Sequence, residues 1–359
     1  MQKKILIVCG TLESGGAERV ISILSKPFAA KYQNVKIITW RHAPIFYKID
    51  SRVEILPLPS EATSHNLIIK LFAFRKLVKK EHPDLILSFL TIFNMFTLVS
   101  LLGIKIPIIV AERNDPRFIK GGGLIKFIRN LLYLKASGIL CQTQSIKDYF
   151  KGKLRQKSDI IYNPVVIPDN LIGKAIKTPK KNRIVTIGRL HPQKNQKLLI
   201  NSFIEFHKSH PDYILSIYGK GELEDELSKY INDVSMTNFI ELVGEQKDVY
   251  QLILDSKVFV LSSDFEGMPN ALIEAMSLGL PCISTKVSGA IDLIENEING
   301  ILVDSNTKSI SNALNKLVDN PDFANSIAHN AVDVHKKLNI DHISNLWIKY
   351  LDRHMFLSD

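Results

Sequence analysis

Short, continuously apolar runs alternate with segments of helical periodicity along almost the whole chain. A run such as residues 4–8 has no polar face, which is typical of a strand covered by helices on both sides of a sheet. Residues 17–29 instead place Val20, Ile23 and Leu24 at helical spacing. Strands that alternate with helices predict parallel sheets with helices on both faces, so the fold class is α/β.

The alternation is interrupted once, between residues 164 and 182, where three prolines and four lysines occur without helical periodicity. The length of 359 residues suffices for two domains. We therefore predict a first domain over 1–165, a linker over 166–182 and a second domain over 183–335. A C-terminal helical segment, 336–359, can cross back to the first domain. Two doubly wound, Rossmann-like domains would face each other across a cleft, with ligands at the carboxyl ends of the strands.

Eleven apolar runs qualify as strands. They are residues 4–8, 35–40, 53–58, 85–90, 108–112 and 138–143 in the first domain, and 183–188, 213–219, 240–244, 258–263 and 281–287 in the second.

Residues 85–104 carry no formal charge over a length that could cross a membrane. Asn94 interrupts this run, and β-rich stretches lie at residues 85–90 and again after Pro107. A strand, a buried helix and a second strand account for the same residues without a membrane span. We expect this second arrangement.

Features of export and of metal binding are missing from the sequence pattern. The apolar stretch near the N-terminus is too short for a signal-peptide core. Cys9, Cys141 and Cys282 lie far apart in apolar runs and form no zinc-binding spacing. These patterns favour a reducing cytoplasm and no disulfide framework.

The net charge of +10 is distributed unevenly, since residues 1–180 contain 29 basic and 12 acidic side chains and the remainder contains 17 and 24. The first half should therefore attract anionic partners. Residues 66–80 and 117–135 combine basic and large apolar side chains, which is typical of helices lying in a membrane interface. Either apolar stripe could equally pack on a sheet. No nucleic-acid-binding motif occurs, so we expect no nucleic acid partner.

The most specific motif is the segment 262–276, SSDFEGMPNALIEAM, which follows an expected strand and begins a helix. The free N–H groups of the first helical turn form an anion site. Glu266 precedes that helix and Glu274 lies inside it, so both carboxylates can accept hydrogen bonds from sugar hydroxyls. The alternative is that Glu266 is only a turn residue and that Glu274 is only a solvated helix residue.

A second motif, residues 188–196, follows the first strand of the second domain. Arg189 and Lys194 would lie at the carboxyl end of this strand, where a guanidinium fork and an ammonium can neutralise a diphosphate. Alone, the segment could be a solvated loop. Next to Glu266 and Glu274, an anion-binding role is favoured.

Three motifs together carry a resemblance: G-G-A-E-R at 15–19, G-R-L-x-x-x-K-N at 188–195 and E-G-M-P-N-A-L-I-E-A-M at 266–276. The chain resembles the retaining glycosyltransferases of family 4, which have the two-domain GT-B fold. This resemblance implies transfer of a sugar from a nucleotide sugar with retention of the anomeric configuration, without a cofactor or a metal. The nearest types build bacterial O-antigen, capsule or lipid-linked oligosaccharide, and include N-acetylgalactosamine transferases.

The resemblance also implies roles for individual residues. Arg189 and Lys194 would hold the donor diphosphate and stabilise the leaving nucleotide. Glu266 would lie beside the transferred sugar, and Glu274 would bind the ribose hydroxyls. The remaining donor-binding candidates are Gly267, Met268, Pro269, Asn270, Ala271, Gly219 and Gly244, and the first-domain glycine loop is Gly15 and Gly16. Each of these glycines could also be an ordinary turn residue.

One segment departs from the family pattern. Many members have a His after the strand that corresponds to residues 108–112, whereas this chain has Glu112, Arg113 and Asn114. These three become candidates for contacting the phosphate or the acceptor. An ion pair between Glu112 and Arg113 is the structural alternative. Asn163 matches an Asn that family members have near the hinge.

From these patterns we expect a cytoplasmic enzyme, peripheral on the inner face of the cytoplasmic membrane. It would transfer a hexose or N-acetylhexosamine, from a UDP-sugar in particular, to a lipid-pyrophosphate-linked saccharide. Two alternatives remain: a UDP-sugar 2-epimerase-like enzyme, which needs no acceptor, and a non-catalytic scaffold that binds a nucleotide sugar or a lipid.

Overall fold

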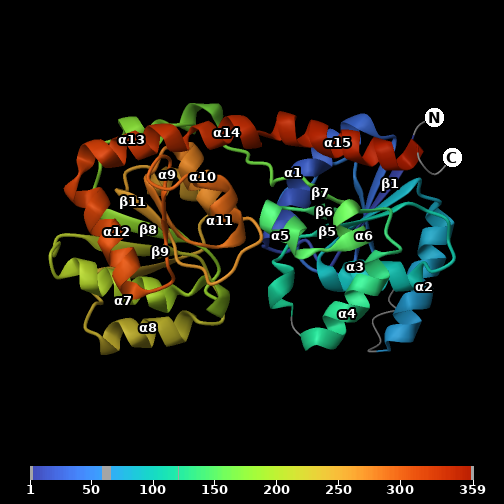
Figure 1. Ribbon diagram of the computed structural model, residues 1–359, viewed down its shortest axis with the longest axis horizontal. Helices are drawn as coiled ribbons and strands as arrows, with labels where there is room; N and C mark the ends of the chain where they lie inside the picture. Colours follow the sequence, from blue (N-terminus) through green and yellow to red (C-terminus); the bar gives the residue numbers. More distant parts are fainter. Residues whose placement is uncertain (1–2, 59–65, 120, 357–359) are drawn as a thin grey trace. The chain divides into compact units, whose positions relative to one another are not determined.

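The computed structural model describes residues 3–58, 66–119 and 121–356 (Figure 1). The chain forms two compact units. The first contains Met1–Pro164 together with Asn339–Asp359, and the second contains Val165–Leu338.

The first unit is built on a seven-stranded sheet with the order β3-β2-β1-β4-β5-β6-β7, in which every pairing is parallel. Its strands are β1 (Lys4–Cys9), β2 (Asn34–Thr39), β3 (Glu54–Pro57), β4 (Leu85–Phe89), β5 (Ile108–Glu112), β6 (Gly138–Cys141) and β7 (Ser158–Ile160). Its α-helices are α1 (Gly16–Lys31), α2 (Leu67–Glu81), α3 (Thr91–Ser100), α4 (Gly122–Tyr133), α5 (Gln144–Tyr149), α6 (Gly152–Gln156) and α15 (Ile340–Phe356).

Helices cover both faces of this sheet, which explains why its central strands are apolar throughout. All residues of β4 and β5 are buried. On one face, α2 and α4 both pack against α3 (Figure 1). Elsewhere in the unit, α1 packs against α15.

The uncharged run at 85–104 forms β4 and α3, followed by β5, so the arrangement of strand, helix and strand is confirmed. Asn94 lies within α3, where its Nδ2 donates to the carbonyl oxygen of Ala111 and to the hydroxyl of Tyr133. Across the described part of the chain, no helix has the length and apolar character needed to cross a membrane.

The C-terminal helix α15 belongs to the first unit. Trp347 on this helix is fully buried. Its ring stacks on that of Phe89 with 5.9 Å between the ring centres, and it meets that of Phe28 edge to face at 6.3 Å. Because these aromatic contacts bury large apolar areas, α15 completes the core of this unit.

The second unit contains a six-stranded parallel sheet with the order β10-β9-β8-β11-β12-β13. Its strands are β8 (Arg183–Ile187), β9 (Ile214–Tyr218), β10 (Ile240–Gly244), β11 (Val258–Leu261), β12 (Cys282–Thr285) and β13 (Ile301–Val303). Its α-helices are α7 (Gln196–His207), α8 (Glu224–Asp233), α9 (Val249–Ile253), α10 (Asn270–Leu278), α11 (Ser288–Leu293), α12 (Thr307–Asp319), α13 (Pro321–Ala331) and α14 (Asp333–Leu338).

The segment expected to be a linker, 166–182, differs from its prediction. It is part of the second compact unit and contains two short 3₁₀-helices, Asp169–Leu171 and Lys174–Lys177. Ile167, Leu171 and Ala175 on this segment are buried. Its prolines and lysines suggested an exposed connection, but its second 3₁₀-helix packs against α10 and α13 of the second unit.

The strand orders locate the ligand-binding edge of each sheet. In the first sheet, the strands that follow β1 are added toward one edge and those that follow β4 toward the other. In the second sheet, the same reversal occurs between β8 and β11. Ligands of doubly wound sheets bind outside the carboxyl ends of the strands at such a switch point. In the second unit, this point lies between the loops that follow β8 and β11.

Candidate functional site

The loops after β8 and β11 are joined by an ion pair between the ammonium of Lys194 and the carboxylate of Glu266. Backbone contact reinforces this connection, since the N–H of Asp264 donates to the carbonyl oxygen of Gln193 at 2.9 Å. The side chain of Lys194 is 22% exposed and that of Glu266 is 9% exposed. The structure therefore brings together two residues that are 72 positions apart in the sequence.

The local sequence explains how Lys194 reaches this position. Residues Pro192–Lys194 form a 3₁₀-helix, and Asn195 follows in a left-handed conformation with φ 47°. Asparagine tolerates this conformation better than most residues. The Asn195 side chain accepts from the N–H of Leu198 at the start of α7 and donates to Asp264 Oδ1 at 2.8 Å. Asn195 thus ends one helix, begins the next and fastens both to the β11 loop.

Several donors hold the Glu266 carboxylate. Ser263 Oγ donates to Oε1 at 2.8 Å, and Lys194 binds the same oxygen. Gln193 Nε2 donates to the carbonyl oxygen of Phe265 at 2.8 Å and lies 3.4 Å from Glu266 Oε2. A carboxylate fixed in this way is suited to accept hydrogen bonds from a ligand at a defined place.

Glu274 lies inside α10, eight positions after Glu266, and is buried. The interpretation as a solvated helix residue is therefore wrong for Glu274. Pro269 precedes the helix, with φ −80° and ψ 101°, and Leu272 and Ile273 donate their N–H groups to its carbonyl oxygen. The turn Gly267, Met268, Pro269, Asn270 and Ala271 thus leads from the Glu266 loop into a buried helix.

Arg189 lies at the carboxyl end of β8 and is exposed. Within the described residues, its guanidinium has no ion pair or side-chain hydrogen bond, whereas its carbonyl oxygen accepts from Gln196 Nε2 at 2.9 Å. An exposed guanidinium at this edge can contact an anion without first breaking an ion pair.

Glycines let the loops at this edge pack closely. Gly219 has φ 144°, and a Cβ there would lie 2.0 Å from the carbonyl oxygen of Gly188. The Gly219 N–H donates to the carbonyl oxygen of Gly244, which itself has φ 79°. A side chain at Gly219 would separate the loops after β8 and β9. Packing alone therefore explains the glycine at position 219, whether or not a nucleotide contacts it.

Gly289 packs directly against the turn that follows Glu266, a contact that the sequence did not predict. A Cβ on Gly289, in the first turn of α11, would lie 2.6 Å from the carbonyl oxygen of Gly267 and 2.6 Å from Cδ of Pro269. The only sequence signal was the Ser288-Gly289 pair after the strand at 281–287.

In the first unit, Gly15 precedes α1 as its N-cap in an extended conformation, with φ −175°. Its carbonyl oxygen accepts from the N–H of Arg19, and a Cβ on Gly15 would lie 2.1 Å from Glu18 Oε2. Gly16 is the first residue of the helix and is exposed. Gly15 and Gly16 therefore lie between β1 and α1, at the carboxyl end of β1.

Glu112 and Arg113 contact different partners, and among the described residues no ion pair joins them. Glu112 is fully buried and accepts from the hydroxyl of Thr91 and, at 2.8 Å, from that of Tyr133. Burial raises the pKa of Glu112 above its ordinary value, because the charged form loses its hydration. Glu112 therefore ties β5 to α3 and α4, and we regard this as a structural role.

Arg113 is buried and donates to Asn163 Oδ1, with its guanidinium 5.6 Å from the centre of the Phe89 ring. The amide of Gln142 lies 2.8 Å from the same Asn163 oxygen. Burial lowers the pKa of Arg113 to about 9. Its Nη1 has no hydrogen-bond partner within the described chain. Asn114, the next residue, is exposed.

The basic helices expose part of their apolar surface. On α2, Phe74 and Val78 are buried, whereas Leu67, Ile68, Ile69 and Phe72 are exposed. On and near α4, the exposed residues are Phe118, Leu124, Phe127, Ile128 and Leu131. The alternative that each apolar stripe only packs on the sheet is therefore incomplete, because each helix carries a second, exposed apolar face.

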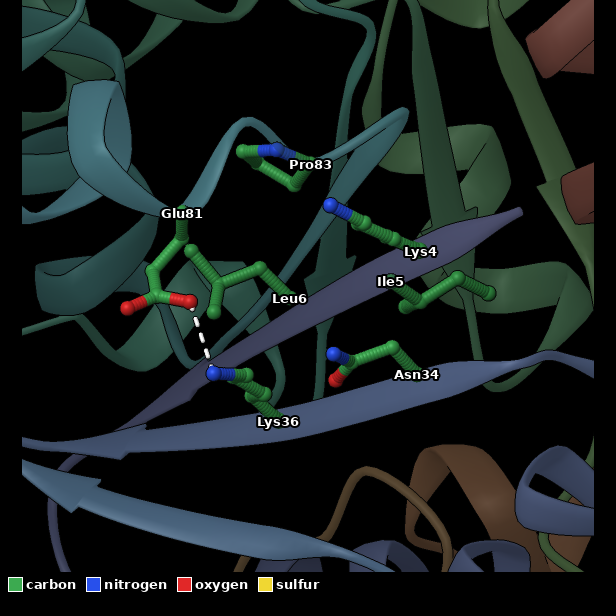
Figure 2. Close-up of a pocket in the computed structure, with 7 residues that line it drawn as sticks. All are labelled: Lys4, Ile5, Leu6, Asn34, Lys36, Glu81 and Pro83. Atoms are coloured by element: carbon green, nitrogen blue, oxygen red, sulfur yellow. Dashed lines mark ion pairs between the residues drawn. The ribbon is translucent and has the colours of Figure 1, made fainter. Parts of the chain in front are cut away.

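A small hollow lies at the opposite edge of the first sheet (Figure 2). It is lined at the amino ends of β1 and β2, where Lys36 Nζ lies 2.7 Å from Glu81 Oε2 and 2.7 Å from Glu54 Oε2. Ligands of parallel sheets bind at the carboxyl ends. We therefore assign this ion-paired hollow a structural role.

Two family models match the chain. The one described as Glycosyltransferase Family 4 matches residues 14–167, and the one described as Glycosyl transferases group 1 matches residues 169–334. Their ranges correspond closely to the two compact units.

Relatives with assigned reactions align over different lengths. An α-1,4-N-acetyl-D-galactosaminyltransferase of Campylobacter jejuni, named for a diphospho-undecaprenol-linked substrate, is 27% identical over 97% of this chain and 98% of its own. A UDP-Gal:α-D-GlcNAc-diphosphoundecaprenol α-1,3-galactosyltransferase of Escherichia coli is 34% identical over 44% of this chain and 42% of its own.

Solved structures share the whole architecture. Anabaena HepE, in complex with UDP and glucose, has a TM-score of 0.81 at 19% identity, covering 98% of this chain and 99% of its own. The apo lipopolysaccharide outer core galactosyltransferase WaaB has a TM-score of 0.76 at 19% identity, covering 99% of this chain and 100% of its own.

Proposed function

Because this chain belongs to the family 4 glycosyltransferases and has the GT-B fold, we propose that it transfers a sugar from a UDP-sugar to a lipid-pyrophosphate-linked saccharide, with retention. The observation that carries this proposal is the Lys194–Glu266 pair at the switch point of the second sheet. The product would enter bacterial surface glycan assembly, such as O-antigen or capsule.

The second domain would hold the donor. Arg189 and Lys194 would neutralise the diphosphate, so that the negative charge developing on the leaving UDP is stabilised during transfer. Glu266 would accept hydrogen bonds from the transferred sugar, and Glu274 from the ribose. The close-packed loops containing Gly219 and Gly244 would shape the nucleotide site from backbone atoms.

Retention and independence from metal are part of the proposal. The names of the Campylobacter and Escherichia relatives specify α-linked transfer, and an α-linked product from an α-configured nucleotide sugar means retention. Two placed cations can supply the charge that a divalent ion would otherwise bring to the diphosphate. We expect turnover to persist in excess EDTA, and its complete loss on chelation, with recovery on adding Mg²⁺ or Mn²⁺, would contradict this part.

The first domain would bind the acceptor. Arg113 is a buried cation without a carboxylate partner among the described residues, and burying such a charge is costly. A phosphate group of the acceptor would supply the missing counter-charge. Gly15, Gly16 and Asn114 lie after strands of the same sheet and would complete the acceptor loop.

Docking on an anionic membrane would bring the enzyme to this acceptor. Phe72 is 68% exposed on α2 and Phe127 is 61% exposed on α4. Lys76, Lys79 and Lys80 on α2 are also exposed. Exposed aromatic residues beside lysines favour an anionic bilayer surface, where each cation contributes about 1 kcal/mol. The enzyme would then be peripheral on the cytoplasmic face.

The assay that tests the function incubates the protein with a panel of UDP-sugars and a lipid-pyrophosphate saccharide, and reads the product mass. We expect one sugar to be added in an acceptor-dependent reaction. Epimerised UDP-sugar without acceptor would favour the epimerase alternative. UDP binding without any turnover across the panel would favour the scaffold alternative.

Membrane docking is tested by co-sedimentation with liposomes with and without anionic lipid. We expect the double variant Phe72→Ser, Phe127→Ser to reduce sedimentation with anionic liposomes. Ile291→Ser is the matched control, because Ile291 is a 52% exposed apolar residue of the second unit. Equal sedimentation of the double variant, the control and the wild type would contradict docking by these helices.

A further inference from the structure

Ser263 connects the Glu266 carboxylate to the sheet. Its hydroxyl donates to Glu266 Oε1 at 2.8 Å, and its carbonyl oxygen accepts from Thr285 Oγ1, on β12, at 2.6 Å. Both Ser263 and Thr285 are buried. Ser263 is therefore fixed at its backbone and can hold the carboxylate at its side chain.

The two oxygens of Glu266 differ in how well they are satisfied. Oε1 accepts the hydrogen bond from Ser263 and forms the ion pair with Lys194. Among the described residues, Oε2 is contacted by Gln193 Nε2 at 3.4 Å, which exceeds the usual range of about 2.7–3.2 Å for N–H···O bonds. A carboxylate oxygen can accept two hydrogen bonds, so Oε2 retains the greater capacity for a ligand.

We propose that Ser263 is a positioning residue for the transfer reaction: it pins Oε1 of Glu266, so that Oε2 is presented to a hydroxyl of the transferred sugar. This inference rests on the proposed role of Glu266 and adds to it which oxygen binds the sugar. It also gives a reason for a serine three positions before the carboxylate.

The contribution of Ser263 should grow when the donor binds. A diphosphate also attracts the Lys194 ammonium, so it competes for the cation that holds Oε1. The Ser263 hydroxyl carries no charge and is not drawn toward the phosphate. It would then be the donor that remains on Oε1 and keeps the carboxylate oriented.

Ser263→Ala removes this donor. We expect kcat/KM to fall roughly 10-fold, which corresponds to about 1.4 kcal/mol. The fall should lie in kcat, and the Kd for UDP should stay the same, because the lost donor orients the carboxylate that is proposed to face the transferred sugar. KM for the acceptor should stay the same.

Ser262→Ala is the matched control. Ser262 is the neighbouring residue, is equally buried, and donates its hydroxyl to the carbonyl oxygen of Lys194 at 2.9 Å, with no contact to the carboxylate. Both variants lose one hydroxyl and one hydrogen bond, so thermal melting should show similar losses of stability. The fall in kcat should be much smaller for Ser262→Ala than for Ser263→Ala. Ser263→Thr, which keeps a hydroxyl, should return kcat toward its wild-type value.

The outcomes distinguish a wrong role for Ser263 from a wrong assignment of Glu266. If Ser263→Ala and Ser262→Ala lower kcat to the same extent while Glu266→Ala is inactive, Ser263 has only a structural role and the inference is overturned. If Glu266→Ala turns over at a near-normal rate, the proposed site itself is wrong. A fall in kcat in Ser263→Ala that Ser262→Ala does not share supports the inference.

Discussion

Glu266 and Glu112 are carboxylates at the carboxyl edges of two parallel sheets, and each accepts a hydrogen bond from a serine or threonine hydroxyl. Their other partners differ. Glu266 pairs with Lys194 and keeps 7% of its surface exposed, whereas Glu112 takes a second hydroxyl, from Tyr133, and has 0% exposed. We therefore propose that Glu266 serves a ligand and Glu112 serves the structure, because their partners and burial differ although both lie at the carboxyl edge of a sheet.

The residues beside the two carboxylates show the same contrast. The Glu266 edge holds the exposed guanidinium of Arg189. At the Glu112 edge the guanidinium of Arg113 is buried against Asn163 and Phe89. We infer that the second domain contacts the charged donor through Arg189, and that the first domain contacts its own substrate through Arg113.

The largest expected effect is the loss of the Lys194–Glu266 pair. Glu266→Ala or Lys194→Ala should lower kcat by about 10²–10³-fold, the size measured when one electrostatic contact to a transition state is removed. Initial rates with a UDP-sugar and the lipid-linked acceptor measure this loss. Thermal melting should show that both variants remain folded.

Lys197→Ala is the control for the lysine variant. Lys197 is exposed on α7 and its ammonium lies 4.6 Å from the centre of the Tyr230 ring. We expect near-normal turnover from this variant. Comparable turnover from Lys194→Ala or Glu266→Ala would show that the site has been assigned to the wrong residues.

A smaller effect is expected at Arg113. Arg113→Gln should raise KM for the acceptor about 10-fold, since a hydrogen bond to a charged group contributes about 1.5–3 kcal/mol. KM for the UDP-sugar should not change. Arg117→Gln is the control, because Arg117 is half exposed and paired with Asp115. An unchanged KM for the acceptor in Arg113→Gln would show that Arg113 does not bind the acceptor.

The smallest effect should appear in stability alone, at Glu112. The pKa of Glu112 is raised in the folded chain, so the folded state binds a proton more tightly than the unfolded state. Its contribution to stability therefore falls as pH rises from the ordinary value of 4.5 through the raised pKa, and is constant above it.

Glu112→Gln removes this titration. Raising the pH from 4 to 8 should lower the Tm of the wild type, relative to the Tm of Glu112→Gln, by roughly 2 °C or more. Thermal melts of both proteins across this range measure it. A difference that does not vary with pH would show that Glu112 is not the titrating group.

Much of the fold follows from local patterns. Each of the eleven apolar runs overlaps a strand, because apolar continuity over five to seven residues suffices to mark a strand covered on both faces. The short strands β7 and β13, of three residues each, were missed because so few residues carry no distinguishable period. Composition misplaced residues 166–182, since burial of Ile167 and Leu171 depends on a core formed by distant residues.

The sequence predicted site candidates only where the residues form a motif that is contiguous along the chain. The local patterns predicted Lys194 and Glu266 as site candidates, and the structure brings the two into contact. The sequence could not give the partners of Glu112 and Arg113. Glu112 is the last residue of β5 and Arg113 is the first residue after it, and Glu112 contacts Tyr133 of α4 whereas Arg113 contacts Asn163. The support of the Glu266 turn by Gly289 likewise depends on a contact between loops.

The central claim is that the second domain alone supplies the cations that bind the donor. Calorimetric titration of UDP into the wild type, Arg189→Gln and Arg113→Gln tests it most directly. We predict a Kd about 10-fold weaker for Arg189→Gln, from the loss of one charged hydrogen bond, and an unchanged Kd for Arg113→Gln. An unchanged Kd for Arg189→Gln with weakened binding in Arg113→Gln would contradict the account.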